Sequence, residues 1–214
     1  MGYIFVISIN IEPNCVFFQA YDEIEMIMAQ KKGGKGHIAL LVALLLAAIC
    51  GFYFFASGQN EHDYDGIIEK MAEKHGVPAT LIKAVIWKES KFKPNIRGKA
   101  GEIGLMQLMP GAIEEWRRGT KTDNTPSEAK VFSPELNIEI GTWYLAWCGG
   151  HWADYKSSLI LQLSEYNAGY GRVKKWKPAD KMAEVKITDI TIPGTRRYIT
   201  DILAKKAEYD KEKK

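Results

Sequence analysis

The chain has 214 residues, of which 46% are hydrophobic and 26% are charged, and its formal net charge is +3. This profile is typical of one globular domain of ordinary size plus an appendage, and it argues against an intrinsically disordered protein. The small net charge argues against a nucleic-acid partner, and three cysteines and four histidines without CxxC or HxxxH spacing argue against a disulfide framework or a metal site.

The first segment, residues 1–37, is predicted to be a leader outside the folded domain. Tyr3–Ile9 is apolar but too short to span a bilayer, and Glu12-Pro13 interrupts it. A bacterial membrane-targeting segment normally begins with positive charges followed by an apolar core, and this order starts at Met28. We therefore hypothesise that translation begins at Met28 and that residues 1–27 are not translated. A translated but poorly structured leader is the alternative.

Residues 38–56 carry no charged side chain and predict a transmembrane segment. As a helix they would be about 28 Å long, which is enough to cross the hydrocarbon core. Three lysines precede the segment and no Lys or Arg follows until Lys70, so the positive-inside rule puts the remainder of the chain outside the cytoplasm. We predict an uncleaved single-pass anchor in the cytoplasmic (inner) membrane, with the domain on its outer, periplasmic side. Cleavage near Ala56-Ser57-Gly58, which would release the domain into the periplasm, is the alternative.

The remainder of the chain reads as consecutive helices with little strand signal, which predicts an all-α domain over residues 64–209. A linker at 57–63 precedes this domain and a charged tail at 210–214 follows it. Ser133, Pro134 and Glu135 give the strongest start signal, an N-cap with proline at the first helical position and an early acid. The predicted helices are 65–75, 78–90, 110–118, 134–148, 154–166 and 195–209. Gly149-Gly150 is expected to end the fourth of these helices, Asp154 to cap the fifth, and 119–132, 172–176 and 191–194 to be a loop, a short turn and a linker.

One acidic residue falls on an apolar helical stripe. Leu81, Ile82, Val85 and Ile86 share one helix face, and Glu89 follows Val85 at i+4 and Ile86 at i+3. Burial there would disfavour the carboxylate and raise its pKa, as a general acid near neutral pH requires. The alternative is that the helix ends before Glu89 and leaves its side chain solvated.

Three sequence blocks extend this observation. They are Glu89-Ser90 with Phe92, Pro94, Gly101 and Gly104–Pro110; Tyr166–Gly169; and Ile192-Pro193 with Thr195-Arg196 and Tyr198-Ile199. Together these blocks resemble the soluble-lytic-transglycosylase-like family (glycoside hydrolase family 23), whose members are relatives of goose-type lysozyme. Because three blocks occur in the family's order, the resemblance is specific, and it covers about residues 64–209.

The resemblance implies a lysozyme-like all-α domain that cleaves the β-1,4 bond between N-acetylmuramic acid and N-acetylglucosamine in peptidoglycan glycan strands. The family's catalytic glutamate, here Glu89, protonates the glycosidic oxygen and then acts as a base on the C6 hydroxyl of the same muramic residue, which attacks its own C1. The product is a 1,6-anhydro sugar, and no water or cofactor is consumed. Ordinary glycosidases use two carboxylates, whereas an internal nucleophile removes the need for the second.

The same resemblance implies which residues contact the glycan. The candidate substrate-binding residues are Ser90, Met106, Gln107, Tyr166, Asn167 and Tyr198. A glutamine amide can pair with acetamido or hydroxyl groups, and a tyrosine offers an apolar face and a hydroxyl. Packing of Tyr198 against its helix, and capping of a helix end by Asn167, are the alternatives.

Four positions depart from the family pattern. Nine residues after the glutamate, where the family often has a serine thought to bond the catalytic carboxylate or the substrate, this chain has Gly98. The usual glutamate before Thr-Arg is replaced by Gly194. Glu165 and Glu102 stand where relatives often have small residues, so both are candidates for a second carboxylate. The helical projection favours a solvated face for Glu165, and the loop position favours a surface site for Glu102.

The predicted function is a membrane-anchored peptidoglycan lytic transglycosylase, an enzyme acting either in general wall remodelling or in local opening of the wall for a secretion or conjugation machine. A hydrolytic muramidase on the same fold is one alternative. A non-catalytic peptidoglycan-binding scaffold, suggested by Gly98 and Gly194, is the other.

Overall fold

The computed structural model describes residues 42–49, 51 and 61–213, and the chain divides into two units, Met1–Ser57 and Gly58–Lys214. In the first unit, residues 42–49 are helical. The rest of the predicted membrane segment and the predicted leader lie outside the described residues. Within the described residues, no helix combines the length and the apolar character needed to cross a bilayer.

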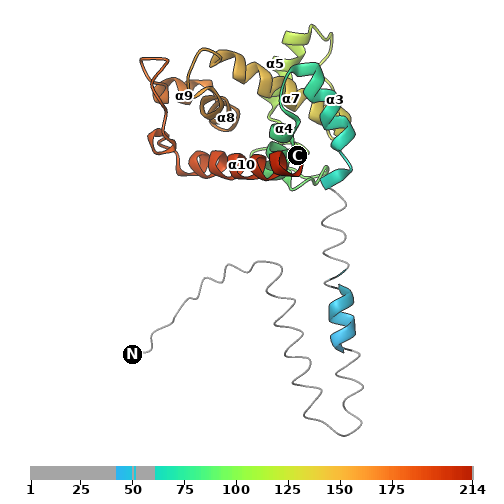
Figure 1. Cartoon of the computed structure of the whole chain (residues 1–214). Helices are drawn as coiled ribbons and strands as arrows, with labels where there is room; N and C mark the ends of the chain where they lie inside the picture. Colours follow the sequence, from blue (N-terminus) through green and yellow to red (C-terminus); the bar gives the residue numbers. More distant parts are fainter. Residues whose placement is uncertain (1–41, 50, 52–60, 214) are drawn as a thin grey trace, which may run out of the picture. The chain divides into compact units, whose positions relative to one another are not determined.

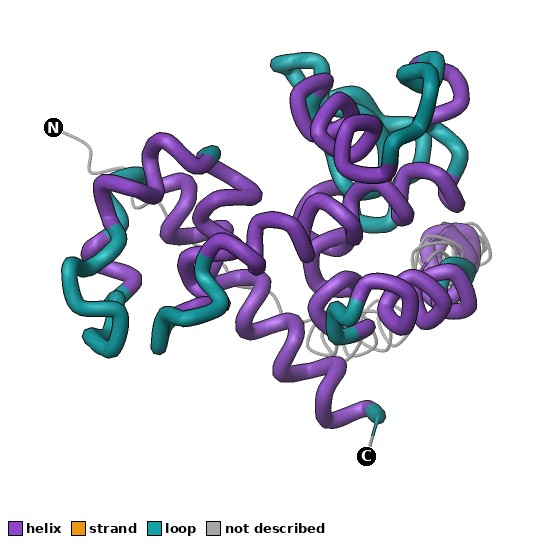
Figure 2. The backbone as a smooth tube through the Cα atoms, turned by 90° about the horizontal axis from the view of Figure 1, so that it is seen from above, coloured by secondary structure: helices purple, strands orange, loops and turns teal. Residues whose placement is uncertain are grey.

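The second unit consists of helices and connecting loops, and no strand is drawn in its described part (Figure 2). This confirms the predicted all-α class. The helices are α3 (Asp65–His75), α4 (Ala79–Ser90), α5 (Pro110–Thr120), α6 (Glu128–Val131), α7 (Pro134–His151), α8 (Ser158–Ala168), α9 (Tyr170–Trp176), the 3-10 helix η1 (Ile187–Asp189) and α10 (Pro193–Glu212). Isolated β-bridges join Ile103 to Arg97 and to Leu108 in the loop after α4.

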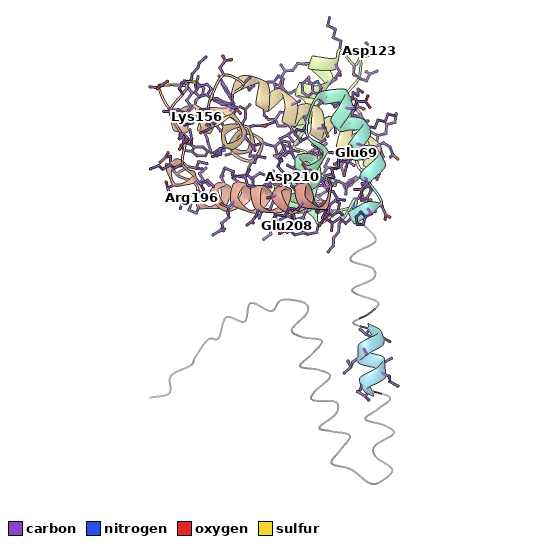
Figure 3. All side chains as sticks on the ribbon, viewed as in Figure 1. Glu69, Asp123, Lys156, Arg196, Glu208 and Asp210 are labelled. Atoms are coloured by element: carbon purple, nitrogen blue, oxygen red, sulfur yellow. The ribbon has the colours of Figure 1, made fainter. Side chains whose placement is uncertain are left out.

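Helix α10 carries part of the third sequence block and packs against the helices that carry parts of the other two. It runs along one side of the unit, with α4 and α8 packed against it (Figure 1). Arg196 and Glu208 mark its beginning and its end in Figure 3. Helix α7 packs against α3, α5 and α8. Helix α4, which carries Glu89, and helix α8, which carries the Tyr166–Gly169 block, therefore share α10 as a partner.

Helix α4 lies in the core. Leu81, Ile82, Val85 and Ile86 are each at most 2% exposed, as the apolar stripe predicted. The helix ends at Ser90, because the next residue takes a left-handed backbone conformation with φ of 53°. Glu89 is therefore inside the last turn of α4, and the alternative in which the helix ends before it is wrong.

Helix α7 does not end at Gly149-Gly150, as the sequence suggested, but continues to His151. Gly149 allows α8 to approach closely, since a Cβ atom there would lie 2.7 Å from Nε2 of Gln162. The same amide donates a hydrogen bond to the Leu145 carbonyl oxygen at 2.8 Å. The two glycines were misread as a stop signal, because the contact between α7 and α8 that explains Gly149 is not local in sequence.

Two more predictions about boundaries were wrong. Helix α8 begins after Ser157 rather than at Asp154, whose carboxylate instead pairs with Lys181 at 3.1 Å. The predicted loop 119–132 contains the short helix α6, whose last residue, Val131, is fully buried. Residues 119–132 thus have the composition of a loop but include one apolar side chain that packs in the core.

Helix α10 begins earlier and ends later than predicted. It starts at Pro193, inside the predicted linker 191–194, with proline at the first helical position, where the missing N–H costs nothing. It continues to Glu212, inside the predicted charged tail. An ion pair between Lys206 and Asp210 at 2.7 Å contributes to its last turns.

Candidate active site

Glu89 and Tyr198 meet between α4 and α10. The Tyr198 hydroxyl donates a hydrogen bond to Oε1 of Glu89 at 2.7 Å. Burial raises the pKa of Glu89 to about 7, and the charge of Glu102 acts in the same direction, whereas the Tyr198 hydrogen bond and the charge of Lys88 lower it. Glu89 is nevertheless partly exposed. A reachable carboxyl group with this pKa can hold a proton at neutral pH and also release it.

Two tyrosines interact electrostatically with the carboxyl group, and of these only Tyr198 donates a hydrogen bond to it. Burial raises the pKa of Tyr198 and of Tyr166 well above the ordinary value, and the negative charge of Glu89 adds to both shifts. The Tyr166 hydroxyl donates to the carbonyl oxygen of Met106 at 3.0 Å. Tyr166 thereby joins α8 to the loop that follows α4, as Tyr198 joins α10 to Glu89.

That loop is held by Asn137, a fully buried residue of α7 that the sequence analysis did not single out. Its Nδ2 donates to the carbonyl oxygens of Ile103 and Val131 at 3.0 Å each, and its Oδ1 accepts from the Met106 N–H at 2.8 Å. Gly104, with φ of 72°, leaves room for the Asn137 amide, since a Cβ atom would lie 3.0 Å from its Cγ. In the sequence, the only sign of this role is that the Asn137 amide lies among the apolar residues of α7, where a buried amide needs hydrogen-bond partners.

Gln107 and Asn167 present polar side chains that are not fully buried. Gln107 lies in the left-handed region with φ of 46°, and its Nε2 donates to the Gly104 carbonyl oxygen at 2.8 Å. Asn167 is exposed at the end of α8, and its Oδ1 accepts from the Thr195 hydroxyl at 2.8 Å. Two surface hollows, of about 350 and 370 Å³, have neither Gln107 nor Glu89 in their lining. The role of Gln107 and Asn167 in binding substrate stays a prediction.

The other two predicted substrate-binding residues outside the tyrosines, Ser90 and Met106, lie inside the domain. Their side chains are buried, with Ser90 3% exposed and Met106 not exposed at all. The Ser90 hydroxyl donates to the Ile86 carbonyl oxygen of its own helix at 3.1 Å. Met106 packs on Gly141, where a Cβ atom would lie 2.8 Å from the methionine Cβ. In this arrangement both side chains support the loop and helix from inside.

Glu165 is fully buried, so the predicted solvated face is wrong. Its Oε2 accepts a hydrogen bond from the Trp152 indole N–H at 2.6 Å, and its Oε1 lies 2.9 Å from Nδ1 of His151. His151 is the last residue of α7 and Trp152 is its C-cap, so both partners follow the two glycines. The helical projection failed because this face of α8 is also buried: Leu161, four residues before Glu165, packs in a second apolar cluster with Trp152.

Comparisons with known proteins show which family the domain resembles. The family model "Transglycosylase SLT domain" matches residues 66–188, which is more than half of the chain. The soluble lytic murein transglycosylase of Escherichia coli (strain K12) is 29% identical over 149 residues, covering 68% of this chain and 23% of the relative. The membrane-bound lytic murein transglycosylase C of Cronobacter sakazakii (strain ATCC BAA-894) is 33% identical over 141 residues, covering 64% of this chain and 39% of the relative.

Solved structures give the same result. An inactive mutant of the lytic transglycosylase Slt from Pseudomonas aeruginosa matches with a TM-score of 0.63 and 27% identity, over 70% of this chain and 24% of that one. The 70 kDa soluble lytic transglycosylase of Escherichia coli matches in fold with a TM-score of 0.64 and 24% identity, over 91% of this chain and 34% of that one. The chain thus spans between 23% and 39% of the length of these four relatives. On its fold and on the extent of the domain match, the chain belongs to the transglycosylase SLT domain family.

Proposed function

We propose that this chain is a peptidoglycan lytic transglycosylase, with residues 64–209 as the catalytic domain and Glu89 as the catalytic residue. The observation that carries the proposal is the Glu89 carboxyl group, whose pKa of about 7 and partial exposure suit a proton donor near neutral pH. The relatives named as lytic murein transglycosylases support the substrate class. The Pseudomonas aeruginosa relative was solved as an inactive mutant in which glutamine replaces a glutamate.

The proposed reaction needs one carboxyl group acting twice. Protonated Glu89 gives its proton to the glycosidic oxygen as the bond from C1 of N-acetylmuramic acid to that oxygen breaks. The resulting carboxylate then accepts the proton of the C6 hydroxyl group, while O6 of the same sugar bonds to C1. The first proton stays on the leaving oxygen, the proton from the C6 hydroxyl group regenerates protonated Glu89, and no water enters the products. Between the two steps, the hydrogen bond from Tyr198 stabilises the carboxylate.

The substrate contacts are assigned by exposure and by hydrogen-bonding capacity. We propose that Gln107 and Asn167 pair with acetamido or hydroxyl groups of the glycan, because both side chains are at least partly exposed and both have polar atoms. Tyr166 and Tyr198 are proposed to position the Met106 carbonyl group and Glu89 next to the sugar. Ser90 and Met106 are assigned to packing.

Digestion of purified sacculi tests this function. The full-length wild-type chain is expected to release muropeptides with 1,6-anhydro ends, detected by mass spectrometry, and Glu89→Gln to release none above background. Glu73→Gln, which changes an exposed glutamate of α3, is the matched control and should behave as wild type. Reducing ends in place of anhydro ends would identify a hydrolytic muramidase instead. Equal release by wild type and Glu89→Gln would contradict catalysis by Glu89.

We also propose that residues 38–56 anchor the domain in the cytoplasmic membrane, with the domain on the outer side. The lysines that precede the segment support this orientation, and one relative is named as membrane-bound. In cells that express the full-length chain, the protein should stay in the membrane pellet after alkaline carbonate extraction and keep its apolar segment by intact mass. A soluble periplasmic product that lacks the segment would contradict the anchor and support cleavage.

A further inference from the structure

Positive charge is concentrated at the end of α4 and in the loop that follows it. Residues 88–99 hold five Lys or Arg and a single acidic residue, Glu89, which gives a formal +4 in a chain whose net charge is +3. Within the loop, Phe92 is only 3% exposed, whereas the basic side chains of residues 91–99 are exposed. The exposed polar residues, which we call the basic strip, are Lys91, Lys93, Asn95, Arg97 and Lys99.

The basic strip connects the two parts of the candidate active site. It begins two residues after Glu89 in the chain. The Gly104 N–H donates to the Ile96 carbonyl oxygen at 2.9 Å, and Nε2 of Gln107 donates to the same oxygen at 3.4 Å. The strip is therefore fixed beside Glu89 by the covalent chain and beside Gln107 by hydrogen bonds.

The backbone at the start of the strip has a conformation that its residues do not favour. Lys91 and Phe92 have φ of 53° and 60°, in the left-handed region that glycine adopts most easily. The turn places the Phe92 ring on Tyr64, with ring centroids 6.5 Å apart. It also places the Lys91 ammonium group over the Trp87 ring, 2.8 Å from the centroid. Backbone strain of this kind is found preferentially at binding and catalytic sites.

Most of the cations in the strip have no acidic partner. Arg97 pairs with Glu128. The acid that follows the strip, Glu102, has one carboxylate oxygen bound by a backbone N–H of the loop. In the described part of the chain, the cations of the strip that form no ion pair are Lys91, Lys93 and Lys99. Their ammonium groups are therefore available to an anion from outside the protein.

A glycan strand that carries peptides is the anion that fits this position. In peptidoglycan, the peptides attached to N-acetylmuramic acid have free carboxylates, whereas the glycan without its peptides is uncharged. The proposed cleavage takes place at an N-acetylmuramic acid residue next to Glu89, so the attached peptide lies within reach of the loop that begins two residues later. Several ammonium groups on one fixed loop match several carboxylates along one peptide.

We propose that the basic strip binds the carboxylates of peptides attached to N-acetylmuramic acid, so that the chain prefers peptide-bearing strands to bare glycan. The proposal rests on the substrate class of the proposed function. It does not rest on catalysis by Glu89, because binding precedes proton transfer.

Binding without turnover tests this proposal. In a full-length Glu89→Gln chain, fluorescence anisotropy compares short labelled peptide-bearing strands with strands of the same length from which an amidase has removed the peptides. The peptide-bearing strands should bind about tenfold more tightly. Adding a triple change in the strip should remove most of this difference, and the three changes are Lys91→Gln, Lys93→Gln and Lys99→Gln.

A second triple variant is the matched control, because it removes the same charge from exposed lysines of other elements that form no ion pair. Its changes are Lys70→Gln, Lys121→Gln and Lys211→Gln. This control should keep the preference for peptide-bearing strands. An unchanged preference in the strip variant, or an equal loss in the control, would overturn the proposal.

Chemical modification of the strands tests the role of charge without changing the strip. Peptide-bearing strands whose carboxylates have been converted to amides should bind the chain with the unmodified strip as weakly as bare glycan. Tight binding of the amidated strands would overturn recognition of carboxylates, whatever the stability of the triple variants.

Kinetics separate this inference from the proposed function. In the chain that retains Glu89, the strip variant should raise KM for peptide-bearing strands about tenfold and leave kcat unchanged. Wild-type protein that cleaves no strand would contradict the proposed function, while a strip-dependent preference in the Glu89→Gln chain would still support the inference. Active wild-type protein without a preference for peptide-bearing strands would overturn the inference alone.

Discussion

Glu89 on α4 and Glu165 on α8 are both glutamates of the domain interior, but they differ in exposure and in their hydrogen-bond partners. Glu165 is fully buried and lies within hydrogen-bonding distance of two nitrogen atoms, Nε1 of Trp152 and Nδ1 of His151. Glu89 keeps partial exposure and accepts from the Tyr198 hydroxyl, and burial raises its pKa to about 7. A carboxylate fixed by directed donors is suited to structure, whereas a desolvated and reachable carboxyl group is suited to proton transfer.

Burial alone therefore does not distinguish a carboxyl group suited to proton transfer from one that has a structural role. Glu165 is the more buried of the two residues, and its polar partners account for that burial. Glu89 differs from Glu165 in its partial solvent exposure. Its pKa is also shifted in opposite directions by its neighbours, since Tyr198 and Lys88 lower it and Glu102 raises it.

Glu89→Gln should have the largest effect on activity. Loss of the general acid and base is expected to lower muropeptide release by about 10²- to 10⁴-fold, measured by mass spectrometry of digested sacculi at constant protein concentration. Glu165→Gln, assayed beside it at a temperature where both variants are folded, should keep activity within a few-fold of wild type. Loss of muropeptide release in Glu165→Gln, with release retained in Glu89→Gln, would contradict the roles given to the two residues.

Tyr198→Phe should have an intermediate effect. Without the hydroxyl group, the carboxylate formed between the two steps loses its donor, so turnover should fall about 10-fold. Because the hydrogen bond lowers the pKa of Glu89, its removal should raise that pKa and move the alkaline limb of kcat/KM upward. A pH profile over the range 5 to about 9 checks the direction. A limb that moves downward, or a tenfold loss with no shift, would contradict this role.

Glu165→Gln should mainly change stability. One carboxylate oxygen that now meets the His151 or Trp152 nitrogen is replaced by an NH₂ group, which should cost about 1–3 kcal/mol. In a chain of this size each kcal/mol corresponds to about 2–4 °C in Tm. Calorimetry of the full-length chain, with Trp152→Phe as the partner variant, measures the loss. An unchanged Tm would argue that Glu165 is not the structural counterpart of Glu89.

The last effect concerns the stability of Glu89→Gln and depends on pH. In the wild type the folded state favours protonated Glu89, so this group's contribution is fully present below pH 4.5 and is lost as pH rises through about 7. Glutamine does not ionise, so the variant should gain Tm relative to the wild type above pH 7, on the order of 5–10 °C, and match it near pH 4. Thermal scans at several pH values measure this, and a gain confined to acidic pH would contradict the raised pKa.

The sequence predicted what depends on local spacing. Glu89 lies at i+3 and i+4 from apolar residues of the same helix, so its place on the buried stripe of α4 followed from period alone. The start of α7 was readable for the same reason, since Ser133 accepts the Leu136 N–H at 3.3 Å. The hydrogen bond between Tyr198 and Glu89 joins residues far apart in the chain, and the family blocks indicated only that both belong to one site.

Contacts between helices were not readable. Gly149 matches a helix-end signal, but in the structure it permits close contact with Gln162. Because the predicted helix ended before His151 and Trp152, these residues were not expected to be partners of Glu165. Asn137 gave a weak signal, because a buried amide is recognisable only when its backbone partners are known. Gly98 and Glu102 were noticed as separate departures, and only the fold of their turn shows that they occupy one space.

The titration of Glu89 near neutral pH can be measured directly by ¹³C NMR of glutamate carboxyl groups in the full-length wild-type chain. The resonance that disappears in Glu89→Gln identifies the residue. We expect this resonance to titrate with a midpoint of about 7. A midpoint near the ordinary value of 4.5 would contradict it.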